Sequence, residues 1–240
     1  MELLKPIYNI EMLLKNSIHF ESLPKISNML HVHAFTFNPI QENTYIVYNN
    51  NGKAIVIDPG CYFTAEQETL QSFLTNNGLT VVQLVNTHCH LDHVFGNKWA
   101  AKAFNLELYI HPEEEKMLAY APQSGIKWGL PFENYTGAIH FLQQDDIIKL
   151  DEDELIVLET PGHSPGSISF YAKAEQFVIA GDALFNGSIG RTDLPFASHQ
   201  QLLDSIKTQL FTLPDEVKVY SGHGRTTTIG HEKLTNPYLQ

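Results

Sequence analysis

A short segment, residues 87–93 (Thr-His-Cys-His-Leu-Asp-His), carries four side chains that can bind metal ions. It comes one residue after the apolar run 81–85, which is typical of a buried strand. Imidazoles and a carboxylate at this density repel and desolvate one another unless a cation holds them. The segment therefore predicts a metal site at the exit of a strand, with ligands for two ions. The four residues are His88, His90, Asp92 and His93.

Cys89 lies within this segment and could itself be a ligand. In an extended chain successive side chains point to opposite sides, so Cys89 points away from His88 and His90. We interpret it as a small buried neighbour. The other cysteine is Cys61, and two cysteines give no disulfide framework, which fits a reducing compartment.

Three later segments repeat one arrangement, an apolar run that leads through glycine or proline to a metal-capable residue. Strand ends bring distant residues to one edge of a sheet, and glycine lets the backbone approach closely there. Each segment alone is more typical of an ordinary turn. Together they predict one site built from several strand ends. They are His163 after 158–162, Asp182 after 178–181 and His223 after 219–222.

The same segments resemble a known family. Five motifs in this order and context resemble the metallo-β-lactamase fold superfamily, from about Met29 to the C-terminus. The resemblance implies an α/β fold, a four-layer αββα sandwich in which helices flank two mixed β-sheets. The motifs are Ile-Asp-Pro-Gly at 57–60, the segment 87–93, Thr-Pro-Gly-His-Ser-Pro-Gly at 160–166, Gly-Asp at 181–182 and Gly-His-Gly at 222–224.

The resemblance also implies a dinuclear metal centre. An aspartate stands at the bridging position, unlike the cysteine of the lactamase subgroup that uses a thiolate there. Imidazole and carboxylate ligands suit zinc, with iron or manganese as alternatives. Asp58 would orient a ligand histidine from outside. The implied ligands are His88, His90 and His163 for the first ion, Asp92, His93 and His223 for the second, and Asp182 for both.

A closer resemblance links residues 187–195, 227–232 and 235–238 to short bacterial hydrolases of the glyoxalase II type. Longer enzymes of that type carry a further helical domain for glutathione after the last ligand, whereas this chain ends soon after His223. Arg191 lies in the first of these motifs. It is expected to pair with a carboxylate of the metal site, to bind a substrate carboxylate, or only to stabilise its loop.

These residues favour hydrolysis of a small-molecule thioester such as S-lactoylglutathione. A metal-bound hydroxide held by Asp92 and Asp182 would attack the carbonyl, which one ion would polarise. A thiol with a pKa of about 8.5 leaves without protonation, so no separate general acid is required.

Two alternative activities stay open, and a third, non-enzymatic one is disfavoured. A persulfide (sulfur) dioxygenase would use one iron at His88, His163 and Asp182. A lactonase or other ester hydrolase would use the same site, because loops such as 121–137 decide the substrate. A structural metal protein is disfavoured, since structural zinc sites close with four ligands and this set leaves open positions.

The composition limits which kinds of partner and which location are expected. The net charge of −12 argues against nucleic acid as a partner. The sequence shows neither a signal peptide nor an apolar stretch long enough for a membrane span, so a cytoplasmic protein is expected, as a monomer or homodimer.

The patterning predicts an N-terminal extension at residues 1–28 and one hydrolase domain at 29–240. An irregular loop is expected at 121–137, and the acidic runs 113–115 and 151–154 are interpreted as solvated. The expected strands are 31–37, 44–48, 53–57, 81–86, 107–110, 147–150, 155–160, 167–171, 177–180 and 217–220. The expected helices are 65–77, 97–104, one opening at 112, and 198–211.

Overall fold

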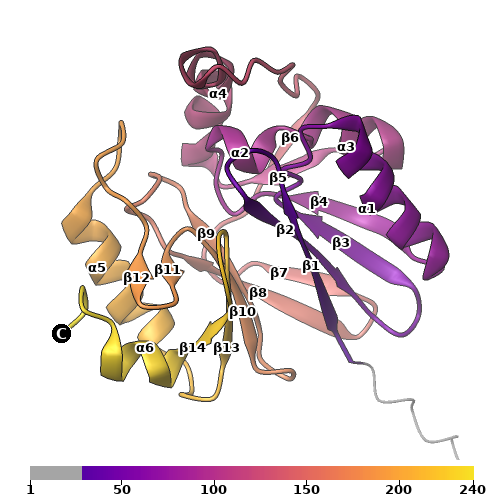
Figure 1. Ribbon diagram of the computed structural model, residues 1–240. Helices are drawn as coiled ribbons and strands as arrows, with labels where there is room; N and C mark the ends of the chain where they lie inside the picture. Colours follow the sequence, from indigo (N-terminus) through magenta and orange to yellow (C-terminus); the bar gives the residue numbers. More distant parts are fainter. Residues whose placement is uncertain (1–28) are drawn as a thin grey trace, which may run out of the picture.

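The computed structural model describes residues 29–240. Two six-stranded sheets face each other and helices cover their outer faces (Figure 1). The four-layer αββα sandwich expected from the sequence is therefore confirmed. The predicted extension at residues 1–28 lies outside the described residues.

The first sheet has the strand order β1-β2-β3-β4-β5-β6. β1 to β3 are antiparallel, and β3 to β6 are parallel. Because β3 and β4 are parallel, the residues that follow them lie at the same edge of the sheet. The strands are β1 (His31–Phe37), β2 (Glu42–Tyr48), β3 (Lys53–Ile57), β4 (Thr80–Val85), β5 (Leu108–Ile110) and β6 (Ile139–Phe141).

The second sheet has the order β14-β13-β10-β9-β8-β7. β10 and β13 are parallel, and β9 runs antiparallel to both β8 and β10. β8, β10 and β13 therefore all end at one edge. The strands are β7 (Ile147–Leu150), β8 (Asp153–Glu159), β9 (Ile168–Ala172), β10 (Phe177–Gly181), β13 (Lys218–Ser221) and β14 (Thr227–Thr228), with a separate hairpin of β11 (Leu184–Phe185) and β12 (Ser188–Ile189).

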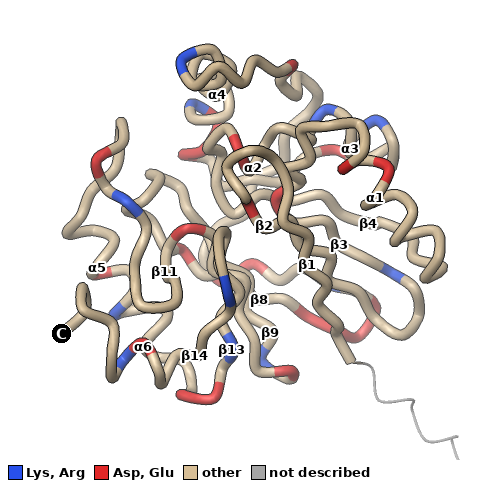
Figure 2. Tube along the Cα trace, viewed as in Figure 1, with Lys and Arg blue, Asp and Glu red and all other residues tan. Residues whose placement is uncertain are grey.

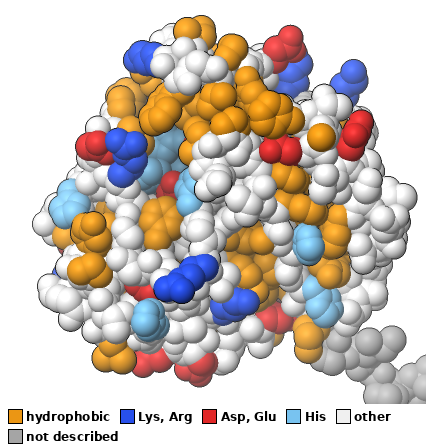
Figure 3. Space-filling model, viewed as in Figure 1, with side chains coloured by type: hydrophobic (Ala, Val, Ile, Leu, Met, Phe, Trp, Pro, Cys, Tyr) orange, Lys and Arg blue, Asp and Glu red, His pale blue; other side chains and the backbone are white. Residues whose placement is uncertain are grey.

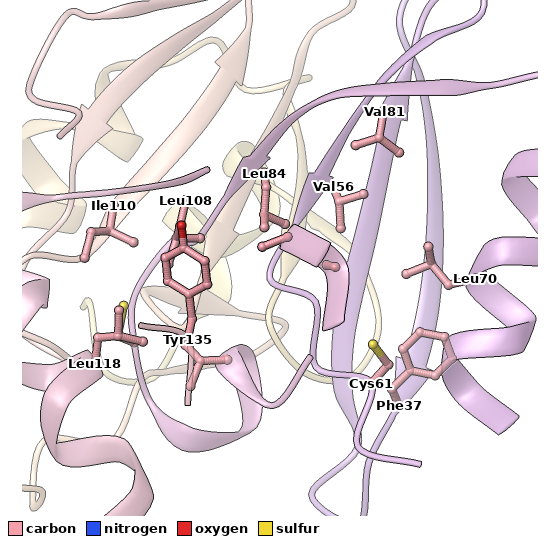
Figure 4. Close-up of a cluster of buried hydrophobic side chains, with 14 of the residues drawn as sticks. Phe37, Val56, Cys61, Leu70, Val81, Leu84, Leu108, Ile110, Leu118 and Tyr135 are labelled. Atoms are coloured by element: carbon pink, nitrogen blue, oxygen red, sulfur yellow. The ribbon is translucent and has the colours of Figure 1, made fainter. Parts of the chain in front are cut away.

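Buried side chains fill three layers. Tyr45 and Ile57 of the first sheet meet Phe170 of the second in the central layer. Figure 4 shows the outer layer of the first sheet, where Leu70 and Leu118 come from helices that cover it. The helices are α1 (Thr64–Asn76), α2 (Leu91–Val94), α3 (Asn97–Phe104), α4 (Glu115–Trp128), α5 (His199–Thr208) and α6 (Ile229–Thr235), with 3-10 turns η2 (Pro112–Glu114) and η3 (Leu210–Thr212).

Helix α4 corrects the loop predicted at 121–137, because it continues through Pro122 to Trp128. Proline has no N–H for the carbonyl of Leu118, four residues earlier. The side chain of Asn134 donates to that carbonyl instead, at 2.7 Å. The helix ends at Gly129, whose φ of 71° suits glycine. Only the part after this residue is irregular.

The prediction that the acidic run 151–154 is solvated is also partly wrong, because β8 begins at Asp153 and this side chain is buried. Asp151 stays in the turn and accepts hydrogen bonds from the side chains of Asn49 and Asn51.

Figure 2 shows lysine and arginine positions scattered along the trace among the aspartate and glutamate positions. None of the helices described is long and apolar enough to span a membrane.

Candidate metal centre

Five strand ends meet at one edge of the sandwich and carry the residues singled out in the sequence. Asp58 follows β3, the segment from His88 follows β4, and His163 follows β8. Asp182 and His223 follow β10 and β13, which are parallel neighbours. The structure therefore brings together side chains from across the chain, as the strand-end pattern predicts.

The segment 87–93 is not extended throughout, which corrects the argument made for Cys89. Helix α2 begins at Leu91, so Asp92 and His93 leave from a helical turn. Cys89 itself is fully buried in the outer core of the first sheet. Burial raises the pKa of its thiol well above the usual value.

His88, His90 and His163 form the first group of potential ligands. One nitrogen of each ring lies within 4.8 Å of the others. Nδ1 of His90 is 2.8 Å from Nε2 of His163, and the ring of His88 stands 4.9 Å from both of the other rings. Three imidazoles converge here on one small volume.

Asp92, His93 and His223 form the second group, again with ligand atoms within 4.8 Å of one another. Oδ2 of Asp92 lies 3.1 Å from Nε2 of His223 and 3.8 Å from Nε2 of His93. This group is adjacent to the first, because the rings of His88 and His93 have centroids 4.1 Å apart.

Asp182 stands between the two groups. Its Oδ2 is 3.4 Å from Nε2 of His163 in the first group and 3.6 Å from Nε2 of His223 in the second. Its Oδ1 is 3.5 Å from Nε2 of His93. The carboxylate is thus placed to serve both groups at once.

Several of the converging atoms are buried without a hydrogen-bond partner. They include Nε2 of His88, Nε2 of His93 and Oδ1 of Asp182. An unsatisfied buried polar atom costs about 1–3 kcal/mol. Since these atoms belong to metal-ligand side chains and lie against one another, the residues fit a bound cation.

The electrostatics of the site favour the same conclusion. Burial, reinforced by neighbouring imidazoles, lowers the pKa of His88 well below its usual value and that of His90 to about 3. Burial also lowers the pKa of His163. The first group therefore presents neutral imidazoles, the form that binds metal ions.

The second group behaves differently. Burial raises the pKa of Asp182, but electrostatic attraction to His93 outweighs this effect and holds the pKa well below its usual value. Conversely, burial lowers the pKa of His93, but attraction to Asp182 and Asp92 raises it well above its usual value overall. The carboxylates of Asp92 and Asp182 thus favour a positive charge in this part of the site.

Hydrogen bonds from outside fix the ring orientations. Nδ1 of His163 donates to the carbonyl of Arg191 at 2.8 Å, and Nδ1 of His223 donates to that of Gln41 at 3.1 Å. Nδ1 of His88 donates to Oγ1 of Thr87 at 3.0 Å. In each ring Nε2 is left facing the site, as second-sphere partners of metal-binding histidines commonly arrange.

Asp58, predicted to orient a ligand histidine, accepts from Nδ1 of His93 at 3.0 Å. It also accepts from the backbone N–H and the hydroxyl of Thr87, at 2.7 and 2.6 Å. Through Thr87 the same carboxylate holds His88, which belongs to the other group. One buried side chain thus positions a member of each group.

Two further buried acids had no signal in the sequence. Glu114 was interpreted as part of a solvated helix start, but it is fully buried and accepts from Cys89, Ser164 and Gly166. Glu42, in β2, is also fully buried, with Oε1 lacking a partner 3.9 Å from Nδ1 of His93. Burial raises the pKa of Glu42 well above its usual value.

The two groups of potential ligands open into a cavity of about 530 Å³, lined by five predicted ligands and by apolar side chains of α4 and of the β11–β12 hairpin. Figure 3 shows histidines at the bottom of a hollow that hydrophobic side chains border. Arg191 lines this cavity, but its guanidinium pairs with Asp193 through two bonds of 2.7 Å. It does not pair with a carboxylate of the site, so that interpretation was wrong.

Six further histidines lie outside the two groups. Each of them is at least partly exposed. They are His31, His33, His111, His140, His199 and His231.

Comparisons of the sequence with known proteins agree with this geometry. The metallo-beta-lactamase superfamily profile matches residues 37–223. Hydroxyacylglutathione hydrolase GloC of Haemophilus influenzae is 36% identical over 201 residues, which cover 83% of this chain and 93% of GloC. The probable metallo-hydrolase YqgX of Bacillus subtilis is 36% identical over 203 residues, covering 84% and 93%.

Solved structures give the same assignment. The B3 metallo-beta-lactamase BLEG-1 superposes with a TM-score of 0.80 at 36% identity, over 88% of this chain and all of that one. TTHA1623, solved in a di-iron-bound form, superposes with a TM-score of 0.78 at 37% identity, over 87% of this chain and all of that one. The chain therefore belongs to the metallo-beta-lactamase superfamily.

Proposed function

We propose that the protein is a dinuclear metal-dependent hydrolase of small-molecule thioesters, with S-lactoylglutathione as the model substrate. The observation that carries the proposal is the pair of three-residue groups joined by Asp182 at the bottom of an apolar cavity. The likeness to GloC of Haemophilus influenzae supports the thioester as substrate.

The proposed ligands follow the two groups. Zinc suits this nitrogen and oxygen set, and iron is the second candidate because TTHA1623 was solved with two irons. When bound, the two ions supply a nucleophile at neutral pH by lowering the pKa of water and polarise the substrate carbonyl. The proposed ligands are His88, His90 and His163 for one ion, Asp92, His93 and His223 for the other, and Asp182 for both.

The side chains of this protein contribute orientation and exclusion of water. Asp58 and Thr87 hold His93 and His88, so the reacting geometry is in place before the substrate arrives. Met117 and Trp128 of α4 give the cavity apolar walls, which offer water no hydrogen bonds. The leaving thiol has a pKa near 8.5, so it departs as a thiolate and needs no acid from the protein.

S-lactoylglutathione turnover by zinc-loaded protein tests this proposal. We expect His90→Ala and Asp182→Ala to lower kcat/KM by more than about 100-fold, since even outer partners of ligands contribute 10–100-fold. His140→Ala is the matched control, because this exposed histidine pairs with Glu107 away from the cavity.

A parental protein no faster than the two site variants would refute the proposal. The same panel includes a lactone and glutathione persulfide. Turnover of the lactone alone would indicate an ester hydrolase, and oxygen uptake with the persulfide would indicate the dioxygenase chemistry.

A further inference from the structure

The sequence has two arginines among its 15 basic residues, and both line the cavity above the candidate metal centre. No lysine lines it. Although the chain has a net charge of −12, both of its guanidinium groups lie at this one cavity. The two groups differ in what holds them.

The guanidinium of Arg191 is already neutralised. Its Nε and Nη2 atoms each donate to a carboxylate oxygen of Asp193 at 2.7 Å. This two-bond pairing is the arrangement in which arginine binds a carboxylate most specifically. Arg191 therefore has little attraction left for a second anion.

Arg225 has no such partner. Its Nε donates to the amide oxygen of Asn186 at 2.9 Å, and Asn186 also lines the cavity. Within residues 29–240 no carboxylate lies within 4.0 Å of its guanidinium, and its terminal nitrogens make no hydrogen bond to that part of the chain. Asn186 thus orients the guanidinium of Arg225, whose positive charge is not paired with a carboxylate among residues 29–240.

The surroundings of Arg225 indicate which kind of ligand its charge could bind. It stands two residues after His223, so it lies beside the proposed reaction centre. The remaining wall is mostly apolar and includes Tyr120 and Trp128 of α4 and Phe185 of β11. A planar guanidinium fits the two oxygens of a carboxylate or phosphate better than an ammonium does.

We propose that Arg225 binds an anionic oxygen group, a carboxylate or a phosphate, on a substrate whose remaining body is apolar enough for the cavity walls. The inference rests on the proposed thioester hydrolysis and narrows its substrate class. Arg225 is then a specificity residue, and Arg191 is a loop residue at the same cavity.

Paired thioesters that differ in one charge test the assignment. One pair has 3-mercaptopropionate or its amide as the thiol half, and a second pair places the carboxylate or amide on the acyl half. A phosphate ester on the thiol half distinguishes the two anions. A charge-assisted bond is expected to make kcat/KM about 10–100-fold higher for the charged member of one pair.

Arg225→Gln should bring that ratio close to one, and Arg225→Lys should restore part of it. Arg191→Gln should keep the parental ratio, because Asp193 already neutralises that guanidinium. A ratio that is the same in Arg225→Gln and the parent for both pairs and the phosphate ester would overturn the assignment.

Thioether analogues, which cannot be hydrolysed, separate this inference from the proposed function. Calorimetry should show the charged thioether binding roughly 10-fold more weakly to Arg225→Gln than to the parent. Equal binding would overturn the role of Arg225 even if every thioester is turned over. Weaker binding without any turnover would retain it and reject thioester hydrolysis.

Discussion

Oδ2 of Asp58 lies 3.0 Å from Nδ1 of His93, and this bond turns the Nε2 atom of the ring toward Asp182. Asp58 adopts a left-handed φ of 50°, uncommon for a residue other than glycine. The carboxylate reaches Thr87, which follows β4, and accepts hydrogen bonds from its backbone N–H and its hydroxyl. A strained backbone is thus retained where it supports two histidines of the site.

Asp58→Asn should lower metal affinity and kcat/KM by about 10–100-fold, the range typical of outer partners of ligand histidines. The amide keeps the shape of the side chain but has one acceptor oxygen for the three donors of His93 and Thr87. Cation titration and steady-state kinetics measure both effects. Parental affinity and activity in a folded variant would show that Asp58 does not position the site.

The sequence alone could predict those parts of the fold whose signals are local. Strands 31–37, 53–57 and 147–150 and helix 97–104 are confirmed with the predicted bounds, because alternation and helical periodicity depend on near neighbours. The convergence at the site was also accessible, since each residue follows a recognisable apolar strand. The ligand roles of these residues stay predictions.

Other features depend on contacts that no local pattern reveals. Residues 113–115 are all glutamate, yet only Glu114 is buried. It accepts hydrogen bonds from three donors in distant segments. Helix α4 passes through Pro122 because Asn134 satisfies the freed carbonyl of Leu118. Both the burial of Glu114 and the continuation of α4 through Pro122 depend on tertiary contacts.

Gly222→Ala should disable the site without unfolding the protein. A Cβ at this position would overlap Oδ1 of Asp182 and lie 2.8 Å from Cε1 of His93. A displacement of about 1 Å in a reacting geometry can cost on the order of 100-fold in rate. We expect such a loss of kcat/KM, together with less bound metal by elemental analysis.

Gly187→Ala is the control for Gly222→Ala. Its φ of 71° makes alanine unfavourable, but its Cβ would meet nothing within 4 Å. This variant should lose some stability and keep its metal. Equal metal content in the two variants would show that the missing Cβ of Gly222 is not required by the site.

Glu114→Gln should lower the free energy of unfolding by about 2–3 kcal/mol, since a buried donor left without its acceptor costs about 1–3 kcal/mol. Glu114 has two acceptor oxygens, one at 2.7 Å from the N–H nitrogen of Cys89 and the other at 2.5 and 2.8 Å from the donors of Ser164 and Gly166. Glutamine has only one acceptor oxygen for these three donors. Urea denaturation measures the loss. Glu113→Gln, which removes only an exposed pair with Lys116, should change the midpoint little.

Glu114 should also leave a signature in the pH dependence of stability. Burial raises its pKa above the usual value, and hydrogen bonds from Ser164, Gly166 and Cys89 offset this only in part. The folded protein then binds this proton more tightly than the unfolded chain does. The contribution of Glu114 to stability is therefore largest below the unfolded pKa of about 4.3 and falls as pH rises through the raised pKa.

The difference in unfolding free energy between the parent and Glu114→Gln should accordingly shrink as pH rises through that window. Taking the difference cancels the titration of groups common to both proteins. A difference that grows with pH would mean that the three donors outweigh burial and hold the pKa of Glu114 below its usual value.

Removal of bound metal should destabilise the fold, because the carboxylates of Asp92 and Asp182 and the orphaned Nε2 atoms of His88 and His93 lose their shared partner. A cation present at about 100 times its Kd contributes about 2.7 kcal/mol. For a chain of this size we expect a strong chelator to lower Tm by roughly 5–10 °C, and added zinc to restore it. Asp182→Ala should respond less, since it has already lost the carboxylate that joins the two groups. If elemental analysis shows that the metal is gone while Tm is unchanged, the site does not hold the fold together.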